Sequence, residues 1–190
     1  HVLGGVGQIA AVIAEPGVIR HTGRMARLVF GERDGEPSAR TGALLAACEK
    51  AGIDAVVSDE IETAIWEKFI LLAPLAGVTS VTRLSIGAVM ADADTRALFR
   101  DAVGEAVAVA RARGVGLGAD SVDRTVELAR GLPFEMRTSM QQDLARGGRL
   151  ELNWLNGAVV RFGAAAGLNT PINRALYAAL KAYADGAPGA

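Results

Sequence analysis

Apolar and polar positions follow two different periods along the chain, and the change falls near residue 57. Before that point, short apolar runs alternate with turn signals, which is the pattern of strands. From residue 58 onward, apolar side chains recur every three or four positions, as they do in amphipathic helices. The pattern therefore predicts a β-rich α/β segment followed by an all-helical segment.

Three apolar runs in the first segment predict an antiparallel meander: "VGQIAAVIA", "VIRHTG" closed by Gly23, and "ARLVFGE". The turns "EPG" and "DG" bound them. Ser38 is a good N-cap for a helix that should run to about Lys50, with Gly52 just beyond its end. The run "IDAVVS" is expected to form one more strand.

Capping residues and glycines divide the second segment into helices. Asp59 followed by Glu62 is an Asp variant of the capping box and predicts the first helix start. Thr170 as cap with Pro171 at the first helical position predicts the start of the last helix. The later helices are expected at about 94–113, 121–130, 134–146, 151–166 and 170–184, with a flexible tail over 185–190.

Composition narrows the function classes. Hydrophobic residues make up 51% of the 190 positions, enough for a buried core, and the net charge of −1 gives no reason to expect a nucleic-acid partner. No apolar run reaches the roughly 18 residues of a membrane span. The start lacks the basic region of a signal peptide, so a cytoplasmic protein is expected. The single cysteine, Cys48, excludes an internal disulfide and is expected to be a buried thiol on a helix.

The opening stretch "HVLGGVGQIAA" contains Gly5, Gly7 and Ala10 in the order G-x-G-x-x-A, a form of the dinucleotide-binding fingerprint. Its context opposes that interpretation. Pro16 would interrupt the required helix within about two turns. The candidate acid, Glu32, follows two turns where a βαβ unit has a helix. The stretch is expected to be a glycine-containing strand instead.

Lys68 is one of only three lysines, the other basic residues being arginines. Apolar residues follow it for several turns. Its ammonium group either extends to the surface or lies partly buried. A partly desolvated lysine is suited to donate a proton to a carbonyl oxygen.

The stretch "TSMQQDLARGGRLELNWLNG" offers polar candidates at Ser139, Asp143, Glu151, Asn153 and Asn156. Glu151 also suits the first turn of a helix for electrostatic reasons, so both a structural and a functional interpretation are open. Gly157 would cost a helix about 1 kcal/mol relative to alanine, which indicates close approach of a helix or ligand. His1 and His21 are the only histidines, and no metal-ligand spacing occurs, so no metal site is expected.

Four stretches in this order resemble the ketopantoate reductase (2-dehydropantoate 2-reductase) family: "IAEPGVIRHTG…RLVFGE", "AGIDA…WEKF", "TSM..DL..G..LE..WLNG" and "GLNTPINRALYAALK". The resemblance implies a mainly α protein, with an all-helical C-terminal domain of the 6-phosphogluconate-dehydrogenase-like type after a β-rich α/β remnant of a Rossmann domain. Residues 1–57 would be the end of the nucleotide-binding domain, and 58–184 the helical substrate and dimerisation domain. The cofactor fingerprint would lie upstream of residue 1, so the chain is expected to be inactive alone.

The implied reaction is the NADPH-dependent reduction of 2-dehydropantoate, or a related 2-oxo acid, in the pathway to pantothenate and coenzyme A. By resemblance, Lys68 is the catalytic lysine and Glu151 is the glutamate that hydrogen-bonds the substrate hydroxyl. Ser139, twelve residues before Glu151, would bind the carboxylate side of the substrate. The partners implied are a small 2-oxo acid and a second copy of the chain.

Three positions depart from the family pattern. Leu72, Ala76 and Ile86 stand where members often have asparagines that help to bind substrate. The pocket is therefore expected to be more apolar, which favours a 2-oxo acid with a bulkier apolar tail. The losses also suit an alternative, a non-catalytic helical dimerisation or binding module that keeps the family fold. The retained Lys68 favours an enzyme.

Overall fold

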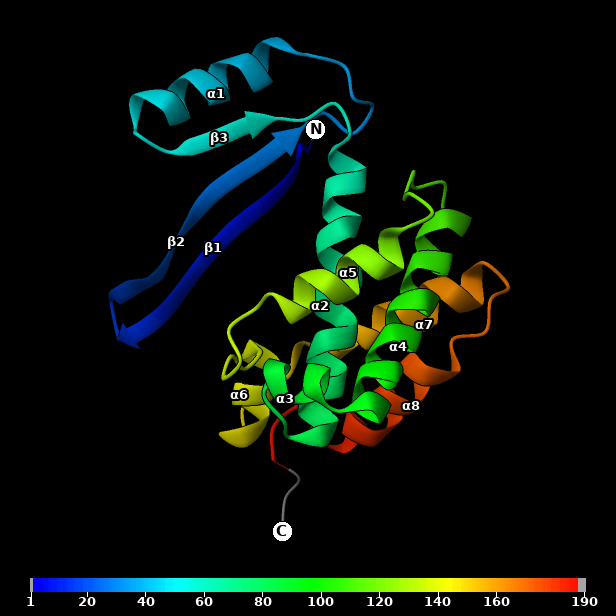
Figure 1. Cartoon of the computed structure of the whole chain (residues 1–190). Helices are drawn as coiled ribbons and strands as arrows, with labels where there is room; N and C mark the ends of the chain where they lie inside the picture. Colours follow the sequence, from blue (N-terminus) through cyan, green and yellow to red (C-terminus); the bar gives the residue numbers. More distant parts are fainter. Residues whose placement is uncertain (1, 188–190) are drawn as a thin grey trace. The chain divides into compact units, whose positions relative to one another are not determined.

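The computed structural model describes residues 2–187, and the chain forms two compact units, His1–Lys68 and Phe69–Ala190. The first contains β1 (Gly4–Glu15), β2 (Val18–Gly31), α1 (Ala39–Lys50), β3 (Asp54–Val57) and the start of α2 (Ile61–Thr82). The described part of the second is helical: the rest of α2, α3 (Ile86–Ala91), α4 (Ala93–Ala112), α5 (Ser121–Arg130), α6 (Ser139–Ala145), the 3-10 turn η1 (Glu151–Asn153), α7 (Asn156–Ala165), α8 (Pro171–Leu180) and η2 (Lys181–Tyr183) (Figure 1). The expected tail lies outside the described residues from position 188 onward.

The sheet of the first unit has the order β1-β2-β3, with β1 and β2 antiparallel and β2 and β3 parallel. The predicted meander is wrong, because two of its runs form the single strand β2. Pairing passes from Ile9↔Ala26 to Ala11↔His21, so residues 22–25 of β2 are absorbed as an irregularity in the ladder. The strand therefore continues through Gly23 instead of ending there.

Helix α1 connects the parallel strands β2 and β3, as a βαβ crossover requires (Figure 1). Its predicted limits are confirmed. Ser38 is the N-cap, and its hydroxyl accepts a hydrogen bond from Thr41 N at 3.3 Å. Gly52 follows the helix with a φ of 68°, a left-handed conformation that glycine adopts without strain. Cys48 is buried on this helix, as expected.

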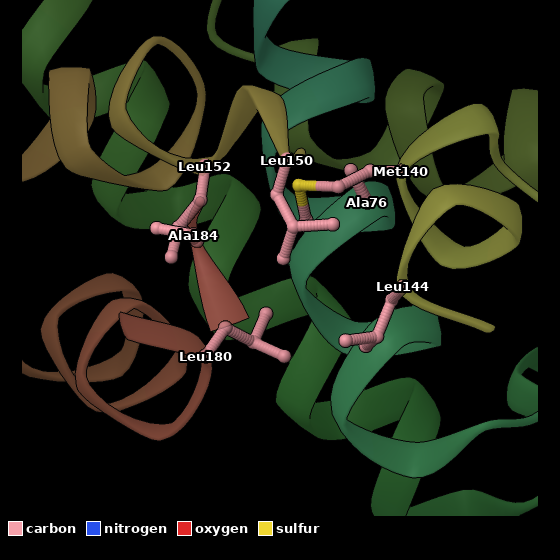
Figure 2. Packing of buried hydrophobic residues seen from close by; sticks show 7 residues of the cluster. All are labelled: Ala76, Met140, Leu144, Leu150, Leu152, Leu180 and Ala184. Carbon is pink, nitrogen blue, oxygen red and sulfur yellow. The ribbon is translucent and has the colours of Figure 1, made fainter. Parts of the chain in front are cut away.

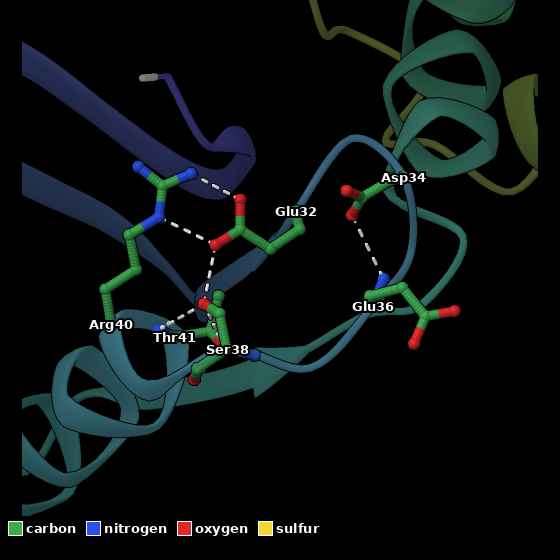
Figure 3. Close-up of polar contacts among 6 residues, drawn as sticks. All are labelled: Glu32, Asp34, Glu36, Ser38, Arg40 and Thr41. Carbon is green, nitrogen blue, oxygen red and sulfur yellow. Dashed lines mark hydrogen bonds and ion pairs between the residues drawn. The ribbon is translucent and has the colours of Figure 1, made fainter.

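Glu32, just after β2, braces the loop that leads into α1 (Figure 3). Its carboxylate accepts bonds from both the Nε and Nη2 atoms of Arg40, and from Ser38 Oγ at 2.5 Å. The Arg40 bond, followed by the Ser38 bond, lowers the pKa of Glu32 from 4.5 to about 2. The ionised carboxylate thus ties the end of the strand to the first turn of the helix.

Helix α4 contributes a large buried face to the second unit. Seven of its residues are buried: Phe99, Ala102, Val103, Ala106, Val107, Val109 and Ala110. By length and composition α2 would also be able to cross a membrane, but more than half of its apolar stretch is buried inside the protein. That burial is the usual situation of a central helix in a globular domain.

The helix start predicted from Asp59 and Glu62 is close to the observed one, because α2 begins at Ile61. The Glu62 carboxylate accepts a bond from Arg33 Nε at 2.6 Å. Another predicted start is wrong. The helix expected from 134 begins only at Ser139. Its missing part is taken by α3, since the carbonyls of Phe134 and Met136 accept bonds from the first two backbone N–H groups of that helix at 2.9 Å.

The helix expected over 151–166 is also divided, into η1 and α7. Leu155, with ψ at −102°, breaks it. The break allows the Asn156 side chain to reach Asn173 of α8, where Asn156 Nδ2 donates to Asn173 Oδ1 at 3.0 Å. The close approach predicted from Gly157 is confirmed, because a Cβ there would lie 2.9 Å from the Tyr177 ring.

A buried polar network joins α4, α7 and α8. Glu105 caps α8 in place of the expected Thr170, since its carboxylate accepts bonds from the backbone N–H groups of Ile172 and Asn173 at 2.7 and 2.9 Å. Asn173 Nδ2 donates to the same carboxylate at 2.8 Å. Both Asn156 and Asn173 are fully buried. The α8 start is therefore held by a charged side chain from another helix.

We expect Gly77→Ala to destabilise the chain. A Cβ at this position in α2 would lie 2.6 to 2.9 Å from the side chain of Asn156, which is fixed by the network and cannot move aside. Overpacking of this kind costs about 1–3 kcal/mol. The control is Gly104→Ala in α4, where the new Cβ has no neighbour within 4 Å and alanine should stabilise the helix by up to about 1 kcal/mol. Urea unfolding followed by circular dichroism measures both, and equal stabilities would contradict the expectation.

We expect Glu32→Gln to remove part of the pH dependence of stability. The pKa of Glu32 in the folded chain lies below the ordinary 4.5, so the ionised group stabilises the fold above that pH. This contribution should disappear as the pH falls from 4.5 toward 2. Urea midpoints across this range would measure it, with Glu36→Gln, an exposed carboxylate, as control. A variant that keeps the wild-type pH profile would refute the role of Glu32.

Candidate functional site

Lys68 lies on α2, at the end of the first unit. It is exposed, and its Nζ donates a hydrogen bond to the backbone carbonyl of Gly7 in β1 at 2.7 Å. Of the two arrangements open from the sequence, the structure has the one in which the ammonium group extends to the surface. An ammonium carries three N–H donors, so two remain for a ligand.

Ser139 is the first residue of α6 and is exposed. Thr138, and not Ser139, caps the helix by accepting a bond from Gln141 N at 3.3 Å. The Thr138 hydroxyl is also 2.9 Å from Thr79 Oγ1 of α2. The residue after Ser139, Met140, is almost completely buried, so the serine lies where the chain leaves the core.

Glu151 is the exposed first residue of η1 and lies between two buried leucines, Leu150 and Leu152. These leucines pack in one cluster with Ala76 and Met140 (Figure 2). The remaining members of this cluster, called the Ala76 cluster below, are Leu144, Leu180 and Ala184. Residues of α2, α6, η1 and α8, and of the segment after η2, thus pack together in this cluster.

The Ala76 cluster brings Ser139 and Glu151 to one region of the second unit, because each is adjacent in sequence to a cluster member. Lys68 belongs to the first unit. The three apolar residues at positions where family members are expected to have asparagine lie in different surroundings. Leu72 is exposed, Ala76 lies in the cluster, and Ile86 is fully buried at the start of α3.

Three residues to which the sequence analysis gave no role in the site brace η1 at Asn153, directly or through one another. Tyr177 OH donates to Asn153 Oδ1 at 2.9 Å and accepts a bond from Lys181 Nζ at 2.6 Å. Arg161 Nη1 donates to Asn153 O at 2.8 Å. The sequence pointed to one of these contacts, because Tyr177 and Lys181 are one helical turn apart and their side chains can meet. Nothing local connects either of them to Asn153.

The described residues do not fit a dinucleotide phosphate. Gly5 and Gly7 lie inside the continuous strand β1, with no helix start after them to hold a pyrophosphate, as expected from the sequence. The one βα turn of the parallel pair carries Glu32, Asp34 and Glu36, whose charges would repel phosphate. Within residues 2–187, no group of three His, Cys, Asp or Glu side chains is placed to hold a metal ion.

Comparison with known proteins places these features in a family. Residues 60–184 match the family model described as ketopantoate reductase PanE/ApbA C terminal. A 2-dehydropantoate 2-reductase of Mesorhizobium japonicum is 36% identical over 96% of this chain and 55% of its own length. The chain spans 55–60% of the length of the first curated relatives it matches.

Solved structures agree with this assignment. A PanE/ApbA family ketopantoate reductase from Ralstonia eutropha superposes with a TM-score of 0.85 and 35% identity, over 96% of this chain and 59% of the other. A dimeric ketopantoate reductase from Staphylococcus aureus gives 0.84 and 26%, over 96% and 61%. The predicted fold class, mainly α with a small β-rich part, is confirmed. The chain belongs to the ketopantoate reductase family and matches its C-terminal, helical part.

Proposed function

We propose that this chain is the substrate-binding and catalytic part of an NADPH-dependent reductase, cytoplasmic in location, that converts 2-dehydropantoate or a related 2-oxo acid to the 2-hydroxy acid. The observation that supports this most directly is that Lys68, Ser139 and Glu151 are all exposed in a chain that belongs to this family. Residues 1–57 would be the end of the nucleotide-binding domain. NADPH, as the hydride source, is part of the proposal, and none of residues 2–187 is assigned to hold it.

Lys68 is proposed to act on the ketone oxygen. That oxygen gains negative charge as the carbonyl carbon is reduced, and a neighbouring ammonium group stabilises the charge and then supplies a proton. The Gly7 carbonyl would orient the ammonium by holding one of its donors. After the transfer, the oxygen is a hydroxyl and Lys68 is a neutral amine.

Ser139 and Glu151 are proposed to bind the substrate. The Ser139 hydroxyl can donate to a substrate carboxylate oxygen, and the Glu151 carboxylate can accept from a substrate hydroxyl. The backbone at both residues is anchored through buried neighbours, Met140 and Leu152, so the core sets the point from which each side chain extends. Anchoring of this kind lowers the entropy that is lost when substrate binds.

A helical dimerisation module without activity is the second candidate, favoured by the apolar residues Leu72 and Ala76. A homodimer is compatible with both candidates, and the relative from Staphylococcus aureus is described as dimeric. Sedimentation velocity would establish the oligomeric state. A dimer that neither binds nor reduces 2-oxo acids would favour the module.

We expect Lys68→Ala to lower kcat for ketopantoate reduction at least about a hundredfold, the usual scale for loss of a general acid. The assay follows NADPH oxidation by the product of the complete gene. Lys50→Ala, an exposed lysine at the end of α1, is the matched control and should retain wild-type activity. Near-normal turnover by the Lys68 variant would refute the proposed role.

We expect Ser139→Ala and Glu151→Gln to act mainly on KM, by about tenfold or more, because each removes one charge-assisted or polar contact to substrate. Both side chains are exposed, so unfolding by urea should be almost unchanged. Loss of stability together with activity would indicate that these residues act on the fold instead.

A further inference from the structure

Glu151 belongs to a short turn that has little support of its own. The 3-10 turn η1 has three residues, and the Glu151 carbonyl accepts bonds from Trp154 N and Leu155 N at 2.9 and 3.1 Å. A turn of this length and type has poor hydrogen-bond geometry and is not stable in isolation. The position of the exposed Glu151 carboxylate therefore depends on contacts that η1 makes with other segments.

Two of these contacts meet at Asn153, the last residue of η1. Arg161 Nη1 of α7 donates to the Asn153 carbonyl at 2.8 Å. Tyr177 OH of α8 donates to the side-chain oxygen Asn153 Oδ1 at 2.9 Å. Leu152, between Glu151 and Asn153, is fully buried in the Ala76 cluster. The turn is thus held at the two positions that directly follow Glu151.

The Tyr177 side chain is itself fixed on two sides. Its ring packs against α7 at Gly157, where a Cβ would lie 2.9 Å from the ring. Lys181 Nζ donates to the Tyr177 hydroxyl at 2.6 Å and lies 4.9 Å from the centre of the ring, within the range of a cation–π contact. A hydroxyl that accepts a bond from an ammonium group is polarised, which strengthens the bond that it donates. The bond from Tyr177 to Asn153 is therefore both oriented and reinforced.

We propose that Tyr177 is a positioning residue for Glu151: its hydroxyl fixes η1 through Asn153 and so holds the carboxylate where it accepts a bond from the substrate hydroxyl. This inference rests on the role of Glu151 in the proposed function. Because η1 is ordered before the substrate binds, binding does not include the free-energy cost of ordering the turn. Without the Tyr177 hydroxyl that cost falls on substrate binding, so KM rises while proton transfer from Lys68 keeps its rate.

The test compares Tyr177→Phe with the wild type in the NADPH assay with ketopantoate, using the product of the complete gene. The variant keeps the ring and loses the hydroxyl. KM should rise about fivefold, the effect of losing one hydrogen bond, and kcat should change less than about twofold. The matched control is Tyr183→Phe in η2, which removes the hydroxyl of a tyrosine that is 37% exposed and should change neither value.

Two substitutions at Asn153 test the other side of the bond. Asn153→Ala removes the acceptor oxygen and should raise KM to the same extent as Tyr177→Phe. Asn153→Asp keeps an acceptor oxygen at that position and should retain most of the wild-type KM. An aspartate variant with the KM of the alanine variant would contradict the proposed bond.

Double variants establish whether Tyr177 acts through Glu151. Adding Tyr177→Phe to Glu151→Ala should raise KM by less than about twofold, because the carboxylate that the hydroxyl positions is already gone. Adding Tyr177→Phe to Ser139→Ala should give the full rise of about fivefold, since Ser139 lies on α6 and takes no part in the bonds to Asn153. A general effect on the fold would instead raise KM equally in both backgrounds.

The possible outcomes separate the two proposals. An unchanged KM in Tyr177→Phe, with or without a lower urea midpoint, would overturn the positioning role, and so would equal rises in the Glu151→Ala and Ser139→Ala backgrounds. In both cases the turnover of the wild type still supports the proposed function. A wild type that reduces no 2-oxo acid would overturn the proposed function and the role of Tyr177 together.

Discussion

The packing of four chain segments around Ala76 is the constraint on which the candidate site depends. Met140, Leu152 and Leu180 reach this point from α6, η1 and α8, and the small alanine side chain leaves room for them (Figure 2). An amide at position 76 would have to find hydrogen-bond partners in this cluster or remain unsatisfied, at a cost of about 1–3 kcal/mol. Alanine avoids that cost and makes the region beneath Ser139 and Glu151 apolar.

One buried polar network of the second unit lies where the start of α8 meets α4 and α7. Glu105 supplies the charge that caps α8, and Asn173 connects that charge to Asn156. Asn156 Oδ1 is buried and accepts no hydrogen bond within the described residues. It lies where a side chain on Gly77 would be, so the glycine and the asparagine are matched by shape. Such a network tolerates few substitutions, because removing one member leaves another unsatisfied.

Local signals predicted the elements whose ends depend on local contacts. Helix α5 has the predicted limits, and α1 begins at the predicted Ser38 cap. The predictions failed where a distant segment takes a backbone group: residues 134–138 leave the helical pattern because α3 needs their carbonyls. Family resemblance gave Lys68, Ser139 and Glu151 their roles, whereas Tyr177 was missed because its contact with Asn153 joins residues far apart in the chain.

The sequence by itself determined the family, the change from a β-rich to a helical segment, and which residues are candidates for chemistry, because these follow from residue types and from spacing along the chain. It also showed that the opening glycines are part of a strand, since Pro16 excludes a following helix. Tertiary structure alone decided that Ser139 and Glu151 border one apolar cluster and that Glu105 of α4 caps α8. Burial and long-range hydrogen bonds set these positions, and neither is encoded in any single stretch of the chain.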